Sequence, residues 1–433
     1  MATIYIDPTV TGTGTGTLGD PFKSWASVSW VGGNSYLQKA GTTFAGQVTV
    51  TSSAAGSAGA PTLIGTYGGG EKARINGAGQ YQGIRVLQNA HYVTIDGFDV
   101  YGQDKQDANT GTTGIFIGDG DTLNANNVRV LNCWVHGNSA VPTYDCNGVK
   151  YFGNNVEISG CLIEDIPTDG IWGYGLAPNI HHNTVRRVDL DGRDAGDCLQ
   201  ITYACNGGRI YKNIFDRSNS ASKQVLIISA ASAGSGCLIE DNYMIAHPYV
   251  AIQTSCIYSD QPGTIIRRNT LIGAYRAVYL HTSTTGCVVE SNLCIYNTIG
   301  IQTANSDIGV VVRNNTIVGA SLYGTYIVDA TANVQNNVFN NCAKGLAVKG
   351  GATRGYNAFY GNGTNFEGIS GGTIGANNLT SDPQLTASYR PMAGSPLIGA
   401  GTHIGYTRDL DKKQRQNPPC IGAYDAATLR KAP

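Results

Sequence analysis

Apolar and polar positions alternate along this chain in a pattern that recurs eleven times. Each copy is a short apolar strand, a polar corner and a second apolar strand, as in VEISGCLI, TIIRRNTL and VVVRNNTI. The corner residue is usually Asn, and successive corners are 20 to 35 residues apart, a period typical of a stacked solenoid. The corners fall at Gly97, Asn132, Gly160, Asn183, Asn213, Asn242, Asn269, Asn292, Asn315, Asn337 and Asn357.

Every period carries a further strand with the order small–apolar–x–apolar, as in TGIFIG and NGVKYFG. The alternation predicts that Ile115 and Ile117 face inward, while Gly114 and Phe116 face outward. The same pattern predicts an outer column of Phe116, Lys150, Trp172, Gln200, Ile227, Gln253, Tyr279, Gln302, Ile327 and Ala347. Stacking of parallel strands about 4.8 Å apart would place each Asn corner above the previous one, where the amides can form a ladder. Since no helical periodicity competes, the sequence predicts an all-β parallel β-helix of eleven or more coils.

Composition supports one elongated repeat rather than several ordinary domains. Gly accounts for 58 of 433 residues, and charged residues for only 14%, against a usual share of about 25%. The net charge of −1 argues against nucleic acid as a partner. No apolar stretch of about 20 residues is present, so no membrane span is expected. The N-terminus, MATIYIDPTV, lacks the pattern of a secretory signal.

The eleven cysteines form no CxxC pair, and Cys133 and Cys161 directly follow their corners. This register indicates small buried side chains with free thiols, although a few disulfides stay possible. We therefore expect folding in the cytoplasm, followed by release or carriage on a virion, with action outside the cell.

The two ends of the chain resemble the pectate-lyase-like superfamily of right-handed parallel β-helix proteins. The resemblance rests on GTLGDPFKSW and SAGAPTLIG near the start, and on SDPQL, GSPLIGAG and CIGAYDA near the end. It implies a cap with first coils at 1–80, a β-helix body at 81–363 and a C-terminal capping segment at 364–433. The superfamily includes lyases, hydrolases, phage tail depolymerases and inert repeats, so the resemblance implies a fold and not one activity. The missing signal and the free thiols favour a phage tail-associated depolymerase, and proteins of this kind are often homotrimers.

The coils from about residue 133 to 225 depart most from the plain repeat, because they are longer and richer in charge and aromatics. Extra length on particular coils is how solenoids build a cleft. The local enrichment in Arg and Lys suits an anionic ligand, such as an acidic polysaccharide. Expected substrate-binding residues are Tyr144, Trp172, Tyr174, Arg187, Gln200 and Tyr203.

We expect these coils to cleave a uronate-containing polysaccharide by β-elimination. A base removes the proton at C5, whose acidity rises when Ca²⁺ or an Arg neutralises the neighbouring carboxylate. Lys150 is the candidate base, Arg193 the charge neutraliser and His182 a proton donor. Asp169, Asp194 and Asp197 are candidate ligands of Ca²⁺ or partners of the substrate. TDGIW and GDCLQI resemble the Asp-bearing coils of β-helix pectate lyases, and NGVKYFG resembles their Lys coil, although the order of the coils differs.

Two other kinds of function stay open. PTDG and AGDC resemble the paired-Asp motifs of polygalacturonase-type hydrolases, in which one carboxyl protonates the leaving oxygen and another activates water. The second motif here has one Asp where that family has two, so elimination is favoured over hydrolysis. The last alternative is a glycan-binding or structural β-helix spike without turnover.

Overall fold

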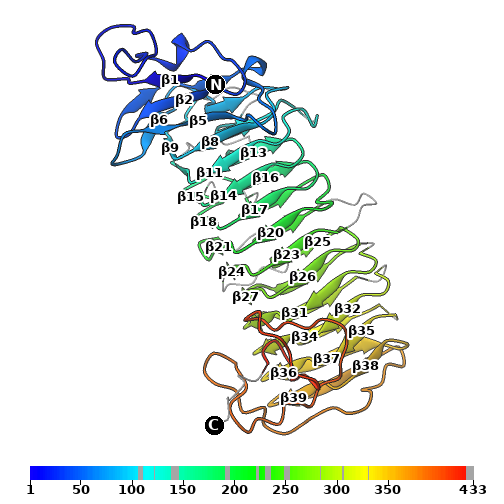
Figure 1. Ribbon diagram of the computed structural model, residues 1–433. Helices are drawn as coiled ribbons and strands as arrows, with labels where there is room; N and C mark the ends of the chain where they lie inside the picture. Colours follow the sequence, from blue (N-terminus) through cyan, green and yellow to red (C-terminus); the bar gives the residue numbers. More distant parts are fainter. Residues whose placement is uncertain are drawn as a thin grey trace. The chain divides into compact units, whose positions relative to one another are not determined.

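The computed structural model describes residues 1–105, 111–120, 122–137, 146–190, 196–220, 224–229, 236–247, 254–282, 284–304, 307–329 and 331–425. The chain folds as two compact units, Met1–Lys223 and Gln224–Pro433. Within the described residues, the regular elements are parallel strands and two 3-10 helices, η1 (Trp25–Ser27) and η2 (Ser52–Ala54) (Figure 1). No helix of these residues is both long and apolar enough to cross a membrane.

The first unit is a parallel β-helix whose strands form three sheets (Figure 1). Sheet I holds β1 (Thr3–Ile6), β2 (Ser35–Lys39), β5 (Thr62–Tyr67), β8 (Val93–Asp96), β11 (Arg129–Leu131), β14 (Glu157–Ser159), β17 (Asn179–His181) and β20 (Arg209–Tyr211). Sheet II holds β3 (Thr43–Ala45), β6 (Ala73–Asn76), β9 (Phe98–Tyr101), β12 (Trp134–His136), β15 (Leu162–Glu164), β18 (Thr184–Arg186) and β21 (Ile214–Arg217). Sheet III holds β4 (Val48–Val50), β7 (Gln82–Val86), β10 (Thr113–Ile117), β13 (Asn147–Phe152), β16 (Ile171–Tyr174) and β19 (Leu199–Ile201).

The second unit repeats the three-sheet arrangement, and its sheets are given the same numerals as the corresponding sheets of the first unit. Sheet I holds β23 (Leu238–Glu240), β26 (Ile265–Arg267), β29 (Val288–Glu290), β32 (Val311–Arg313), β35 (Asn333–Gln335) and β38 (Thr353–Gly355). Sheet II holds β24 (Tyr243–Ala246), β27 (Thr270–Ile272), β30 (Leu293–Ile295), β33 (Thr316–Val318), β36 (Val338–Asn340) and β39 (Ala358–Tyr360). Sheet III holds β22 (Leu226–Ile228), β25 (Ser255–Ser259), β28 (Arg276–Leu280), β31 (Ile299–Thr303), β34 (Tyr323–Ile327), β37 (Lys344–Lys349) and β40 (Thr364–Ile369). The predicted all-β parallel β-helix is confirmed.

Strict alternation fails at the start of the sheet III strands. Ile115 and Ile117 are fully buried as predicted, but a Cβ on Gly114 would lie 2.3 Å from Val135 Cγ1, so Gly114 also faces the core. The equivalent position of the next coil shows the cause. There the amides of two successive residues, Gly148 and Val149, both donate to the same neighbouring segment, whereas a regular strand uses every second amide. Such an irregularity slips the alternation by one residue, as a β-bulge does. The outward position predicted for Gly114 is therefore wrong.

The Asn ladder exists, with one correction to its register. In the second unit, both the backbone amide and the Nδ2 group of Asn269 donate to Asn292 Oδ1, and Asn292 donates to Asn315 in the same way, at 2.9–3.1 Å. Asn132 does not belong to this ladder, because it takes the left-handed position (φ 51°) that precedes a ladder residue. Cys133 follows it and is buried, so small thiols replace the amides in the early coils.

Nine cysteines of the described residues are free and buried, as the register predicted: Cys133, Cys146, Cys161, Cys198, Cys256, Cys287, Cys294, Cys342 and Cys420. Burial raises the pKa of the Cys256 and Cys287 thiols to about 12, so these thiols stay protonated and act as packing groups.

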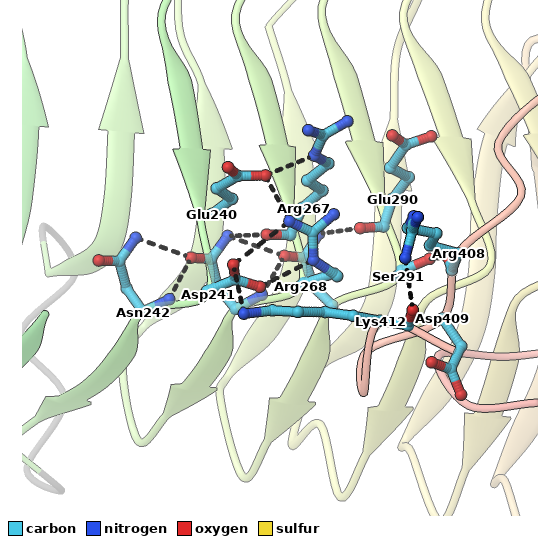
Figure 2. A network of polar contacts seen from close by, with 12 residues as sticks. Glu240, Asp241, Asn242, Arg267, Arg268, Glu290, Ser291, Arg408, Asp409 and Lys412 are labelled. Atoms are coloured by element: carbon cyan, nitrogen blue, oxygen red, sulfur yellow. Dashed lines mark hydrogen bonds and ion pairs between the residues drawn. The ribbon is translucent and has the colours of Figure 1, made fainter. Parts of the chain in front are cut away.

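The C-terminal strap (residues 402–425) returns along the coils of the second unit. Ala423 and Tyr424 pack against Leu293, and the Ala423 amide donates to Thr316 Oγ1 at 2.9 Å. Figure 2 shows the polar contacts nearby: Asp241 accepts from Arg268 and also pairs with Lys412 of the strap at 3.0 Å. The CIGAY sequence is thus a buried docking segment that runs beside the coils.

Candidate functional site

The outer face of sheet III carries the predicted column of the first unit. Phe116, Lys150, Trp172 and Gln200 are paired in register from β10 to β19 and are half-buried, so this part of the column is confirmed. Lys150 Nζ lies 4.5 Å from the centre of the Trp172 ring and 5.7 Å from that of Phe152. A cation is thereby held against an aromatic surface.

The aromatic rings continue along this face as a platform of Phe152, Trp172, Tyr174 and Tyr203. Phe152 and Trp172 are 5.2 Å apart between ring centres, and Tyr174 and Tyr203 are 4.7 Å apart. Trp172 and Tyr174 lie nearly parallel, at an interplanar angle of 10°. Tyr203 is 37% exposed, so the end of the platform is open to a ligand. Flat rings with polar edges suit the apolar faces and hydroxyls of a sugar chain.

Asp169 and Asp197 lie just before their sheet III strands and are almost fully buried. The Asp197 amide donates to Asp169 Oδ1 at 2.7 Å, so one carboxylate links two successive coils. Among the described residues, no three His, Cys, Asp or Glu side chains are grouped as a metal site. Asp194, the third predicted ligand, lies outside the described residues, as do Arg193 and Tyr144. The Ca²⁺ site at Asp169, Asp194 and Asp197 therefore stays a prediction.

His182 and Arg187 lie on other faces of the coil. His182 occupies the corner between β17 and β18 with a left-handed φ of 56°, and Arg187 follows β18. The Arg187 guanidinium donates to both Asp165 oxygens and to Glu164 at 2.7–2.9 Å. Its hydrogen bond holds the pKa of the Asp165 carboxyl below the usual range, even though burial opposes this. The sequence analysis grouped these residues with Lys150 because they belong to the same coils. Each coil has three faces, however, and His182 and Arg187 are not on the face of Lys150.

In the second unit the outer column differs from the prediction at two positions. Tyr258 pairs with Ile227 on one side and Tyr279 on the other, so Tyr258 is the member from β25. The predicted member Gln253 lies outside the described residues. Tyr326 pairs with Gln302, whereas the predicted Ile327 is fully buried. At both positions of the column the member is a tyrosine, which carries a hydroxyl and an aromatic ring.

Tyr258 belongs to a hydrogen-bonded group that sequence analysis missed. His281 Nδ1 lies 2.8 Å from Asp260 Oδ1 and 2.6 Å from the Tyr258 hydroxyl. Burial and the nearby Asp260 carboxylate raise the pKa of Tyr258 well above its usual range, so the phenol keeps its proton at neutral pH. When the Nδ1–H of His281 faces Asp260, the other ring nitrogen is left with a lone pair. The group therefore combines a protonated phenol with an oriented imidazole.

Arg276 supplies a positive charge beside this group. Its guanidinium lies 4.2 Å from the centre of the Tyr279 ring and 4.8 Å from that of Tyr275, and Nε donates to Gln302 at 2.7 Å. Tyr279 also contacts His281, with ring centres 5.2 Å apart. Burial lowers the pKa of Arg276, although the guanidinium remains charged in proteins. We name Tyr258, Asp260, Arg276, Tyr279 and His281 the tyrosine–histidine cluster.

The slipped alternation explains why this cluster was missed. In RAVYLH, both Ala277 and Val278 are fully buried, so Arg276 and Tyr279 both face outward from one short strand. Regular alternation would have placed Arg276 and Tyr279 on opposite faces. The available signal was the clustering of Tyr, His and Arg in two neighbouring repeats.

Comparison with known proteins supports the fold. Residues 217–384 match the family described as "Periplasmic copper-binding protein (NosD)". A search of curated protein sequences gives no match. The chain is similar in structure to a mannuronic acid specific family 6 polysaccharide lyase from human gut microbiota, at a TM-score of 0.57 and 12% identity over 89% of this chain and 92% of that one. The fold is a right-handed parallel β-helix.

Two further β-helix structures show the same likeness. The PL6 family alginate lyase AlyGC matches with a TM-score of 0.57 and 12% identity, over 89% of this chain and 54% of its own length. XylC in complex with xylose matches with a TM-score of 0.55 and 10% identity, over 98% of both chains. The resemblance to right-handed β-helix proteins of the pectate-lyase-like kind is confirmed at the level of fold.

Proposed function

We propose that this protein cleaves a uronate-containing polysaccharide by β-elimination on the outer face of sheet III. The observation that carries the proposal is the tyrosine–histidine cluster, in which a protonated phenol, an imidazole held by a carboxylate and a guanidinium lie on one face of neighbouring coils. Elimination requires these three kinds of group and no nucleophile.

Each group has one role in the proposed reaction. Arg276 binds the substrate carboxylate and spreads the negative charge that develops when the C5 proton leaves. His281 takes this proton on the nitrogen that faces away from Asp260, and Asp260 stabilises the resulting imidazolium. The C4–O bond breaks as the C4–C5 double bond forms, and Tyr258 donates its proton to the leaving oxygen. Afterwards His281 releases its proton to solvent and Tyr258 regains one from solvent, so both groups return to their starting state.

Similar proteins add support of a weaker kind. Two of the structures named above are lyases, one specific for mannuronic acid and one for alginate. Both substrates are acidic, which agrees with the cation at Arg276 and with Lys150 on the corresponding face of the first unit. At 12% identity this likeness concerns the fold, so the proposal depends on the cluster.

The platform of the first unit is assigned to substrate binding. A Trp ring under Lys150 stabilises the ammonium form of the side chain, whereas a base has to be the neutral amine. Lys150 is therefore proposed to pair with a uronate carboxylate, while the rings of Trp172 and Tyr174 stack on the sugars. Its predicted role as the base would be supported if Lys150→Gln removed cleavage but left binding intact.

A Trp172→Ala variant is expected to raise KM for the polysaccharide about tenfold, a change of about 1.4 kcal/mol, with little change in kcat. The reason is that stacking contributes to binding the ground state and the transition state alike. Initial rates over a range of polymer concentrations measure both constants. Trp134→Ala, a half-buried Trp on sheet II, serves as the matched control and should leave KM unchanged. Equal effects of both variants would contradict the platform.

Removal of divalent metal by a chelator is expected to leave cleavage unchanged, since Arg276 neutralises the carboxylate without a metal ion. Rates before and after treatment with EDTA, and after return of Ca²⁺, test this expectation. A loss of activity that Ca²⁺ restores would instead support the predicted calcium role of Asp169, Asp194 and Asp197.

The proposal is tested by incubating the full chain with alginate, pectate and other uronate polymers. Elimination creates an unsaturated sugar that absorbs ultraviolet light, and this absorbance should rise with one of them. New reducing ends without this absorbance would indicate hydrolysis by the paired-Asp alternative. Binding without new ends would indicate the non-catalytic alternative.

A further inference from the structure

Sheet I of the first unit carries a second hydrogen-bonded array on its outer face, formed by Ser159, His181 and Glu157. Ser159 Oγ lies 3.0 Å from His181 Nδ1, and His181 Nε2 lies 3.1 Å from Glu157 Oε1. The parallel register explains the arrangement, because Ser159 on β14 pairs with His181 on β17, while Glu157 precedes Ser159 by two residues on the same face.

Protonation within this array follows from the carboxylate. Burial tends to raise the pKa of Glu157, but hydrogen bonds from Arg129 and His181 hold it below the usual range, so Glu157 is ionised. Arg129 Nε donates to Glu157 Oε2 at 2.6 Å, and Oε1 accepts from His181. Since an ionised carboxylate can only accept, Nε2 of His181 carries a hydrogen. In the neutral imidazole, the Nδ1 lone pair then faces both the Ser159 hydroxyl and His182 Nδ1, which share this acceptor.

The surroundings leave this array accessible to a ligand. His181 is 13% exposed and Glu157 is 21% exposed at the side chain, and Ser159 is half-buried. The His181 ring stacks on Tyr211 at 4.6 Å, and the Arg209 guanidinium lies 4.0 Å from the centre of the same Tyr ring. His182 Nδ1 lies 2.8 Å from His181 Nδ1, so a second imidazole borders the array. An aromatic ring beside a cation is again a surface that suits an acidic sugar.

We propose that Ser159, His181 and Glu157 form a serine esterase site for acyl groups carried on sugar hydroxyls. A nucleophile hydrogen-bonded to a base, which a third group orients, is the arrangement that activates a serine hydroxyl. This activity is separate from elimination and uses no residue of the tyrosine–histidine cluster.

The proposed reaction has two balanced steps. Ser159 Oγ bonds to the acyl carbon while its proton moves to His181 Nδ1, and His181 passes that proton to the sugar oxygen as the acyl–oxygen bond breaks. Water then attacks the acyl-serine and gives its proton to His181, which returns it to Ser159 as the carboxylic acid leaves. Glu157 stabilises the imidazolium in both steps.

The class of substrate follows from how the site can stabilise the negative charge that develops on the acyl oxygen. The Gly160 amide, next to Ser159, donates to the His181 carbonyl at 3.3 Å, so it does not serve as an oxyanion donor. The positive charge of this face, to which the exposed Arg209 contributes, is left to stabilise the developing charge. Such a site suits esters, whose alcohol leaves readily, rather than amides, which depend on strong oxyanion stabilisation.

Labelling of the full chain with a fluorophosphonate, a reagent for activated serines, tests the proposal. Mass spectrometry of the digested wild-type protein should find the adduct on Ser159. The Ser35→Ala variant, which changes a half-buried serine of the same sheet, should be labelled as fast as the wild type. Glu157→Gln should slow labelling at least tenfold, because the oriented imidazole loses its ionised partner.

A second readout is the hydrolysis of 4-nitrophenyl acetate, which should fall at least tenfold in Ser159→Ala and stay unchanged in Ser35→Ala. The absence of an adduct on Ser159 in the wild-type protein would overturn the proposal, whether or not the variants fold. Equal labelling rates of the wild-type protein and a folded His181→Ala variant would overturn it as well. Neither outcome bears on the elimination assay.

Discussion

An Arg276→Ala variant is expected to lower kcat/KM for the uronate polymer at least about 100-fold, on the order of 3 kcal/mol of transition-state stabilisation. Without the guanidinium, the negative charge that develops next to the substrate carboxylate has no cation to bind it. The loss should appear mainly in kcat, because the guanidinium acts on the charge that develops in the transition state. Initial rates of formation of the unsaturated product give both constants.

Two further variants separate this role from a structural one. Arg354→Ala removes another half-buried guanidinium of the second unit, one that contacts Lys349 and Thr373, and should leave kcat/KM unchanged. Arg276→Lys keeps the charge but loses the planar fork that contacts Gln302, so an intermediate rate is expected. An unchanged rate for Arg276→Ala in a folded protein would remove Arg276 from the mechanism.

An Asn292→Ala variant is expected to destabilise the second unit by about 3 kcal/mol. Asn292 Oδ1 accepts from two groups of Asn269, and its Nδ2 donates to the Ile266 carbonyl and to Asn315. Alanine leaves these buried donors and acceptors without partners, and each unmet group costs about 1–3 kcal/mol. Unfolding in denaturant, followed by circular dichroism, measures the change in the free energy of unfolding.

The matched control for the ladder is Gln88→Ala, which removes an exposed amide and should change the free energy of unfolding by less than about 0.5 kcal/mol. Asn292→Asp should destabilise the unit at least as much as Asn292→Ala, because a buried carboxylate cannot donate to Ile266 or Asn315 and places its oxygen against theirs. A change for Asn292→Ala as small as that for Gln88→Ala would contradict the ladder as a source of stability.

The fold was predictable because the apolar positions recur with the period of the coils. Buried residues such as Ile115 and Ile117 have to recur once per coil for coils to stack, and ladder amides have to recur at the same corner. Asn132 was misplaced by one position, because Asn tolerates the left-handed corner as well as the ladder site. The path of the strap could not be predicted, because CIGAY packs against coils about 100 residues earlier in the chain.

The candidate site was predictable only in part. Lys150, Trp172 and Gln200 lie in one column because regular spacing carries them there. Arg276 and Tyr279 share a face only because a local irregularity, at the small residue that recurs in the sheet III strands, slips the regular alternation. Ser159 and His181 meet across two coils, which requires the register of β14 and β17 as well as the sequence.

The central claim is that this protein cleaves an acidic polysaccharide by elimination. The most direct measurement is the mass of the oligosaccharide products formed in water labelled with heavy oxygen. Elimination adds no water, so the account predicts products without heavy oxygen. The fragment on the non-reducing side of each break keeps the glycosidic oxygen, and the other fragment carries the new double bond. Heavy oxygen in the products, beyond the exchange at reducing ends measured on finished product in the same water, would show hydrolysis and contradict the account. The absence of cleavage with every uronate polymer tested would contradict it as well.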